Sequence, residues 1–380
     1  MDVTADPLSL LRERTSRKWR SFPADVLPLF VAESDFPLAA PVREALAAAV
    51  RHGDTGYVAP DTELGAAFAG FAGRRWDWPV DPEQVTTTTD VSVAIVETLR
   101  MLIRPGDRVV ITPPVYPPFF DLVPEAGGVV HAVPLLDGQT GWTLDLDGLE
   151  RAFAAGVRCV LLCNPHNPIG HPHTVEDLAA LAGLAARYGV TVVSDEVHAP
   201  LTYSDAAFTP YLTVSPEAAD HGVCVTSASK AWNLAGLKCA LIVTAGERMR
   251  GGLAALPQEV SWRTSQFGLI AGIAAFRDGE PWLDGVLESL DGNRHRLTAL
   301  LDAQLPGVGY RPPEAGYLAW LDLRSLDWGD DPALVALERA RVALSPGPMF
   351  GEPGRGFARL NFGCSPEVLA EAVSRLAAAR

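Results

Sequence analysis

Short runs of β-branched and aliphatic residues alternate with longer amphipathic segments through the middle of the chain. Uninterrupted apolar strands separated by helices are typical of a parallel sheet covered on both faces, so this region predicts an α/β fold with a mostly parallel central sheet. In such sheets active sites form beyond the carboxyl ends of the strands, and the residues after each run are therefore the first functional candidates. The predicted strands span residues 108–112, 129–133, 157–163, 190–194, 223–227 and 240–244, and the predicted helices between them include 91–103, 146–155 and 175–188.

The pattern changes after Pro281, where one long helical segment is followed by shorter elements. We expect helices at 282–305, at 332–341 and from Pro366 onward, with strands at 317–323, 342–345 and 357–362. This is typical of a smaller α+β unit. The chain is thus predicted to comprise an N-terminal segment (1–45) that packs on the small domain, a large domain (46–281) and a small C-terminal domain (282–380).

Composition limits the possible partners and location. The 380 residues include 46 Asp and Glu against 31 Lys and Arg, for a net charge of −15, which argues against nucleic acid as a partner. The chain shows neither a signal peptide nor an apolar stretch long enough to cross a bilayer, so we expect a cytoplasmic protein with no membrane partner. The five Cys include no Cys-x-x-Cys pair and are expected to be reduced core thiols.

Several common catalytic motifs are missing from the sequence. It contains no Gly-x-Gly-x-x-Gly, no Gly-x-x-x-x-Gly-Lys-Ser/Thr and no Gly-x-Ser-x-Gly, which disfavours dinucleotide oxidoreductases, P-loop hydrolases and serine hydrolases. His166, His171 and His173 lie close enough in sequence to chelate a metal. They lack a carboxylate or Cys ligand at a suitable spacing, so we expect loop histidines near a cleft and no metal site.

Four polar residues occupy positions where chemistry is expected in the predicted sheets. Asn167 lies in a pair of Asn-Pro turns after one apolar strand, and Asp195 ends the next, where its burial is costly unless it meets a cation. Lys230 follows a third strand among small hydroxyl residues, an environment that lowers an ammonium pKa and suits a Schiff-base nucleophile. Arg359, on a C-terminal strand, could hold a carboxylate. Each alone has an ordinary explanation: a turn, a helix cap, a surface lysine or an ion pair.

Taken together, these residues fit one cofactor, pyridoxal 5′-phosphate. Lys230 would bond to its aldehyde, Asp195 would keep the ring nitrogen protonated, and Asn167 would contact the ring 3-oxygen. Arg359 and Asn167 would bind the α-carboxylate end of an amino-acid substrate. Tyr116, after the first strand, offers a flat face that could stack on the ring.

The turn before the predicted helix 91–103 is the candidate phosphate site. The backbone N–H groups of Val91 and Ser92 could bind the phosphate at the helix N-terminus. Ser227 and Lys238 could add a hydroxyl group and a positive charge. Asp90, at the same turn, would repel a phosphate unless its side chain turned away or capped the helix.

These motifs resemble those of fold-type-I pyridoxal-phosphate enzymes over essentially the whole chain, most closely the MalY/PatB branch of cystathionine β-lyases. Residues 227–238 are similar to that branch's lysine motif, residues 31–37 to its N-terminal segment and residues 52–57 to its Gly-Tyr segment. The resemblance implies an aspartate-aminotransferase-like fold and a homodimer with shared active sites. It also implies that Tyr57 reaches the phosphate and substrate of the neighbouring subunit, while Ser229 and His198 complete the cofactor contacts.

The resemblance implies α,β-elimination of L-cystathionine or another L-cysteine S-conjugate to a thiol, pyruvate and ammonia. Lys230, Asp195 and Tyr116 would be the catalytic residues. A class I/II aminotransferase is the alternative, because both reactions begin by removing the same α-proton. A surface role in regulation could coexist with catalysis. Residues 32–34 read Ala-Glu-Ser where the family has Ala-Asp-Met, which leaves the substrate open.

Overall fold

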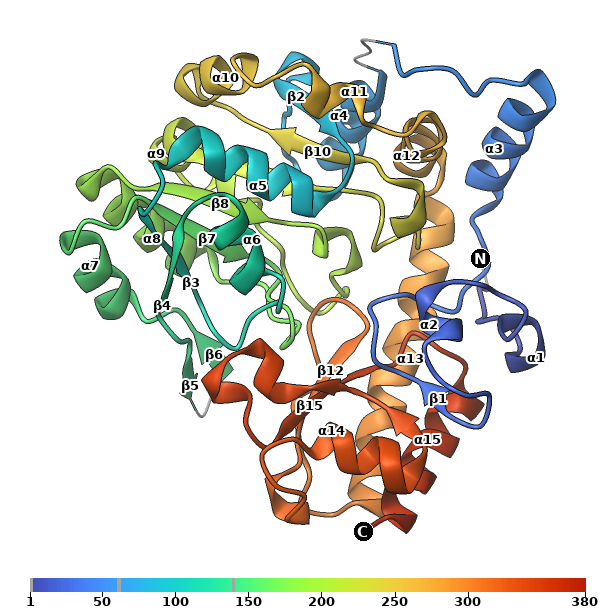
Figure 1. Ribbon diagram of the computed structural model, residues 1–380. Helices are drawn as coiled ribbons and strands as arrows, with labels where there is room; N and C mark the ends of the chain where they lie inside the picture. The colour runs from blue at the N-terminus through green and yellow to red at the C-terminus, as the bar shows by residue number, and fades with distance from the viewer. Residues whose placement is uncertain (1–2, 60–62, 139–140) are drawn as a thin grey trace.

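The computed structural model describes residues 3–59, 63–138 and 141–380, so the first two residues of the predicted N-terminal segment lie outside it. Within these ranges, seven strands form a central sheet in the order β2-β10-β9-β8-β7-β3-β4 (Figure 1). Strand β10 runs antiparallel to both of its neighbours, and the other adjacent pairs are parallel. The strands are β2 (Val85–Thr88), β3 (Arg108–Ile111), β4 (Val129–Ala132), β7 (Cys159–Cys163), β8 (Thr191–Asp195), β9 (Gly222–Thr226) and β10 (Ala240–Val243).

Helices cover both faces of this sheet, which explains why its central strands are apolar without alternation. In β7, Val160 and Leu162 pack with Leu178 and Leu181 on one face, whereas Leu161 packs with Ile95 and its neighbours on the other. The helices on the Ile95 face are α5 (Val91–Leu102), α6 (Phe119–Glu125) and α10 (Glu247–Ala254), and those on the other are α7 (Leu146–Ala154), α8 (Val175–Tyr188) and α9 (Pro216–His221).

The predicted elements of this region are confirmed to within two residues at each end. Local signals account for the agreement: α8 begins after Thr174, whose hydroxyl accepts the N–H of Asp177, and ends before Gly189, which adopts a left-handed φ of 67°. Strand β2 was not predicted, because its sequence Val-Thr-Thr-Thr is polar and lies at the edge of the sheet.

A C-terminal unit lies beside the central sheet, and the long helix α13 (Glu280–Gln304) runs along both (Figure 1). Its antiparallel sheet has the order β11-β12-β15-β14, and α15 (Pro366–Ala378) packs against α13. The strands are β11 (Gly309–Tyr310), β12 (Leu318–Asp322), β14 (Ser345–Pro346) and β15 (Phe357–Asn361).

Two predicted elements of this unit differ in detail from the structure. The helix expected at 332–341 is present over 332–340, but only α14 (Pro332–Val335) is α-helical; a π-helical turn follows it and ends where Arg341 takes a left-handed φ of 55°. The strand expected at 342–345 is divided between β13 (Val342–Ala343) and β14, which belong to different sheets. The left-handed Arg341 and the break at Leu344 interrupt what the sequence pattern shows as one continuous segment.

The N-terminal segment crosses this C-terminal unit. It contains the short helices α1 (Leu8–Leu11) and α2 (Arg17–Arg20), and strand β1 (Leu27–Pro28) pairs in parallel with β13. The division into three domains with boundaries at 45 and 281 stays a prediction.

A buried ion pair fixes the path of the N-terminal segment toward the central sheet. Lys18 Nζ lies 2.7 Å from Asp35 Oδ1, with both side chains at most 1% exposed, and it also donates to the carbonyl of Glu33 at 3.0 Å. Burial raises the pKa of Asp35, whereas the Lys18 ammonium opposes that rise. Loss of either partner would leave an uncompensated buried charge, which typically costs about 3–5 kcal/mol.

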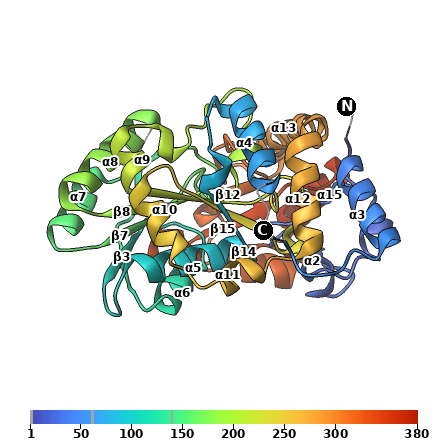
Figure 2. The same ribbon diagram turned by 90° about the horizontal axis from the view of Figure 1, so that it is seen from above.

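The remaining helices lie along one side of the molecule. Figure 2 shows α3 (Ala40–His52) at the edge, where it packs against α12 (Gln266–Asp278), and α12 in turn packs against α4 (Glu63–Trp76). A short hairpin of β5 (Leu136–Gly138) and β6 (Gly141–Thr143), the single turn α11 (Glu259–Trp262) and several short 3₁₀ segments are the other regular elements of the described residues. In the part of the chain that the structure describes, no helix has the length and apolar character needed to cross a membrane.

Candidate active site

A cavity of about 170 Å³ lies beyond the carboxyl ends of β7, β8 and β9, at the N-terminus of α5. This is the position that a parallel sheet favours for a ligand. Most of the predicted site residues line it, namely Val91, Ser92, Tyr116, Asn167, Asp195, His198, Ser227, Ser229, Lys230 and Lys238. The structure therefore brings together residues that lie up to 147 positions apart, a span that runs from Val91 to Lys238.

Lys230 projects from the loop after β9, and its ammonium donates to the carbonyl of Ala32 at 3.2 Å. Burial lowers the pKa of Lys230 to about 8; the positive charge of Arg359 adds to this effect, and the carboxylate of Asp195 opposes it. The loop itself is held by Ser227, whose hydroxyl accepts the N–H of Ser229 at 3.0 Å. Lys230 therefore has an appreciable neutral fraction near neutral pH, which a nucleophile or general base requires.

Asp195 is the last residue of β8, and its Oδ1 accepts the N–H of Val197 at 3.2 Å. Burial raises the pKa of Asp195 to about 7, although the Val197 N–H and the charge on Lys230 oppose this rise. No ion pair to Asp195 occurs among the described residues. A buried carboxylate of this kind suits a ligand that brings a cationic nitrogen into the cavity.

Two neighbours of Asp195 have separate roles. Glu196 accepts hydrogen bonds from the hydroxyl of Ser194 at 2.9 Å and from the N–H of Tyr211 at 2.8 Å, so it ties β8 to the following loop. His198 lines the cavity edge-on to Tyr317, with ring centroids 6.5 Å apart. Burial lowers the pKa of His198 to about 3, so its ring is neutral and can serve only as a hydrogen-bonding group near neutral pH.

Arg359, on β15, lies behind Asn167 and links the C-terminal unit to the cavity. Its Nη1 donates to Asn167 Oδ1 at 3.0 Å, and its Nη2 donates to the carbonyl of Phe30 at 2.9 Å and to Ser345 Oγ at 3.1 Å. Its buried Nε has no partner in the described parts of the chain. Burial lowers the pKa of Arg359 to about 10, so the guanidinium stays charged and fits an incoming carboxylate.

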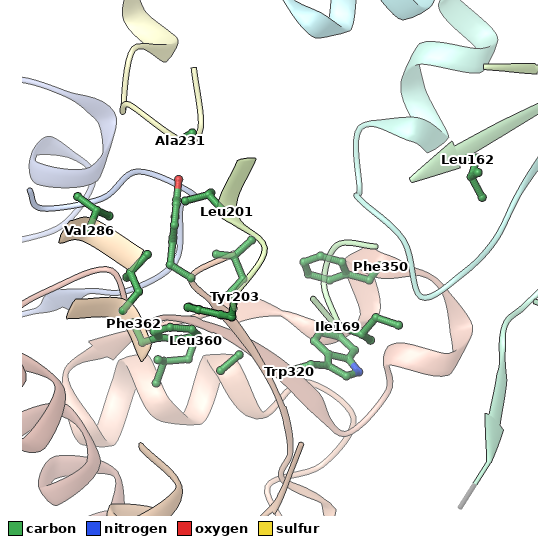
Figure 3. Packing of buried hydrophobic residues seen from close by; sticks show 14 of the residues in the cluster. Leu162, Ile169, Leu201, Tyr203, Ala231, Val286, Trp320, Phe350, Leu360 and Phe362 are labelled. Carbon is green, nitrogen blue, oxygen red and sulfur yellow. The ribbon is translucent and has the colours of Figure 1, made fainter. Parts of the chain in front are cut away.

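The guanidinium of Arg359 packs against a row of aromatic side chains. The Arg359 guanidinium carbon lies 5.1 Å from the ring centroid of Phe350, which packs edge-on against Trp320 at 5.1 Å (Figure 3). Trp320 in turn stacks on Phe357 at 5.2 Å. Packed aromatic rings of this kind restrict the positions that the Arg359 side chain can take.

Tyr116 lines the same cavity and meets Phe119 edge-on at a centroid distance of 5.8 Å. Burial raises the pKa of its phenol, and the nearby Asp195 carboxylate adds to this effect, so the hydroxyl stays protonated. That its ring stacks on a cofactor stays a prediction.

The predicted phosphate site lies at the start of α5. Asp90 caps this helix, because its Oδ1 accepts the N–H of Val93 at 2.9 Å, and its Oδ2 accepts a hydrogen bond from Lys238 Nζ at 2.8 Å. The N–H groups of Val91 and Ser92 have no possible partner within the helix and remain for a ligand. The Ser227 hydroxyl donates to the carbonyl of Cys239 at 2.7 Å, so its proton is already engaged.

Two predicted residues do not line this cavity: Arg359 contacts it through its hydrogen bond to Asn167, whereas Tyr57 lies apart from the other predicted residues. The side chain of Tyr57 is 97% exposed, and it does not line the cavity of this chain.

The histidines of the loop 166–173 have partners other than a metal. His166 contacts the carbonyl of Pro114 at 2.8 Å, and His171 pairs with Glu314. Across the described ranges, no group of three or more His, Cys, Asp or Glu side chains is arranged to hold a metal.

The sequence interpretation missed two asparagines that position the cavity wall. The side chain of Asn233 bonds to both the N–H and the carbonyl of Ser34, at 3.1 and 3.0 Å. Asn361 donates to the carbonyls of Val31 and Glu33 at 2.7 and 2.8 Å. Asn233 lies in the 227–238 segment and Asn361 in the predicted strand 357–362, but a sequence pattern does not reveal a side chain that bonds to a distant backbone segment.

The residues fit pyridoxal phosphate on their own chemistry. The cavity contains an amine of lowered pKa, a buried carboxylate without a cation, and a helix N-terminus beside a lysine. Next to it lies a buried guanidinium whose Nε has no partner in the described chain. These four features match, in turn, the cofactor's aldehyde, ring nitrogen and phosphate, and the carboxylate of an amino acid.

The chain is similar to known proteins along nearly its whole length. The model of the family aminotransferase class I and II matches residues 24–376. A Mycobacterium tuberculosis protein provisionally named cystathionine β-lyase is 46% identical over 97% of this chain and 95% of its own length. Cystathionine β-lyase PatB of Bacillus subtilis is 36% identical over 93% and 92%. A crystal structure from Corynebacterium diphtheriae, provisionally described as a pyridoxal-phosphate-dependent β-cystathionase, has a TM-score of 0.94 and 35% identity, covering 99% of this chain and 98% of its own.

Proposed function

The chain belongs to the aminotransferase class I and II family, and we propose that it is a pyridoxal-phosphate-dependent carbon–sulfur β-lyase acting on L-cystathionine or another L-cysteine S-conjugate. The similarity to cystathionine β-lyases confirms the predicted resemblance, and the aspartate-aminotransferase-like fold class is confirmed with it. The observation that carries the proposal is that Lys230 and Asp195 line one cavity and that Arg359 lies behind it, hydrogen-bonded to the lining residue Asn167.

Substrate orientation rests on the arginine. The guanidinium of Arg359, held by Asn167 and Phe30, would bind the α-carboxylate, and its Nε, which has no partner among the described residues, supplies a further donor. Because Arg359 sits on a strand over packed aromatic rings, the carboxylate would be held in one place relative to Lys230.

Proton transfer rests on Lys230 and Asp195. Pyridoxal phosphate, when bound, supplies an aldehyde for the substrate amine and a ring that withdraws electrons from the α-carbon. The neutral amine of Lys230 would take the α-proton, and the electron pair left behind would expel the β-sulfur as a thiolate. The Asp195 carboxylate would hold a proton on the ring nitrogen. Hydrolysis of the remaining three-carbon fragment yields pyruvate and ammonia.

An incubation with L-cystathionine tests this function directly. Purified protein loaded with pyridoxal phosphate should release pyruvate and thiol in equal amounts without an added keto acid. Conversion of the cofactor to its amine form without pyruvate would instead show an aminotransferase, the alternative function that would use the same residues. Protein that binds no pyridoxal phosphate would contradict both. S-substituted cysteines with larger leaving groups, assayed alongside, would define the substrate range.

We also propose that the protein is a homodimer whose partners share their active sites. Tyr57 is 97% exposed in this chain and lies in the 52–57 segment, whose resemblance implies a contact with the neighbouring subunit. In a dimer it would reach the cavity of the other protomer. Sedimentation equilibrium should give twice the chain mass of 40.5 kDa, and a fully active monomer would contradict the proposal. A cytoplasmic location and the absence of nucleic-acid partners stay predictions.

A further inference from the structure

The phosphate end of the cavity contains an anion that belongs to the protein itself. Asp90 places a carboxylate at the N-terminus of α5, between the Val93 N–H at 2.9 Å and the Lys238 ammonium at 2.8 Å. We propose, resting on the proposed function, that Asp90 is a built-in competitor for the cofactor phosphate and weakens the binding of pyridoxal phosphate.

The backbone conformation of both partners holds this pair in place. Asp90 is extended, with φ at −159°, so that its side chain folds back over the first turn of α5 as a helix cap. Lys238 has a left-handed φ of 59°, a conformation that non-glycine residues rarely adopt. The pair is therefore a defined part of the cavity wall, where Asp90 and Lys238 lie together with Val91 and Ser92.

A phosphate would use the same two attractions that Asp90 already uses. A helix N-terminus and a lysine are the common features of phosphate sites, because both present positive charge to the anion. The Asp90 carboxylate neutralises Lys238 and adds its own repulsion at that point. Its side chain is 31% exposed and that of Lys238 53%, so solvent weakens the repulsion without removing it. The pair should thus hold the helix end and the lysine in place while lowering affinity for phosphate.

The variant Asp90→Asn tests this inference, because asparagine caps a helix about as well as aspartate but has no charge. Full-length wild type and variant should be compared by equilibrium dialysis against pyridoxal phosphate and against pyridoxal, which lacks the phosphate. We expect Asp90→Asn to bind pyridoxal phosphate at least about fivefold more tightly, the order expected for loss of one charge a few ångströms from an anion. Pyridoxal affinity should not change. Asp90→Ser, a second uncharged cap, should behave in the same way.

The chain offers a matched control in Asp145. This residue caps α7 through the N–H of Gly148 at 2.8 Å and faces Arg151 at 3.6 Å, but it lies outside the cavity. Asp145→Asn should leave the affinity for both compounds unchanged. Pyridoxal phosphate binding that is equal or weaker in both Asp90 variants, or an equal gain for pyridoxal, would overturn the inference alone. Wild-type protein that binds neither compound would overturn the proposed function and this inference with it.

Discussion

Replacing Lys230 with alanine should lower lyase turnover by at least about four orders of magnitude while leaving the protein folded. Among the described residues the side chain of Lys230 makes one hydrogen bond, to the Ala32 carbonyl, so its truncation breaks a single polar contact. It does remove the amine whose pKa burial lowers to about 8, and with it the proposed acceptor of the α-proton. Pyruvate release from L-cystathionine measures the loss, and thermal unfolding of the same samples reports the fold.

The control variant for this prediction is Lys230→Arg. Arginine retains a positive charge in the cavity but cannot deprotonate near neutral pH, so it should be as inactive as alanine. Turnover within tenfold of the wild type in either variant would show that another group takes the proton. Lys230→Ala should not lower the unfolding temperature, because the loop is held by the Ser227 hydroxyl, which accepts the Ser229 N–H.

The central sheet and its site were predictable because their signals are local. Asp195 ends one apolar run, and Lys230 lies four residues after the end of the next strand, so parallel strands bring both to one edge. The helix at the phosphate end was predictable from its cap at Asp90. In each case a few neighbouring residues contain the information that determines the structure.

The features that could not be predicted depend on contacts between distant segments. The reciprocal bonds between Asn233 and Ser34 join positions 199 residues apart, and nothing in either neighbourhood shows the pairing. The Lys238–Asp90 pair spans 148 residues, so the sequence could not show that Lys238 is the counter-ion of the capping carboxylate. Tyr57 illustrates the limit of a single chain, since its ring is exposed and does not line the cavity formed by the described residues.

Replacing Asp195 with asparagine should separate activity from stability. Asparagine can still accept the Val197 N–H, but it cannot supply the negative charge that would hold a proton on the ring nitrogen. Turnover should therefore fall by about three orders of magnitude, as for loss of a principal electrostatic contact to the reacting group. Pyruvate release from L-cystathionine is the measurement, with Glu196→Gln as the neighbouring buried-acid control, for which a much smaller loss of turnover is expected because Glu196 bonds away from the cavity.

The same change should stabilise the cofactor-free protein, and more so at higher pH. Burial raises the pKa of Asp195 from 3.8 to about 7. Between these pH values the carboxyl group is therefore ionised in the unfolded chain but mostly protonated in the folded protein. The resulting penalty is absent below pH 3.8, grows as the pH rises toward 7 and is complete above it, where it amounts to roughly 4 kcal/mol. Without cofactor, Asp195→Asn should thus unfold at a higher temperature than the wild type, by a larger margin at pH 8 than at pH 5. An equal margin at both pH values would show that folding does not raise the pKa of Asp195. It would also contradict the idea that the cavity holds a carboxylate whose charge needs a cationic ligand.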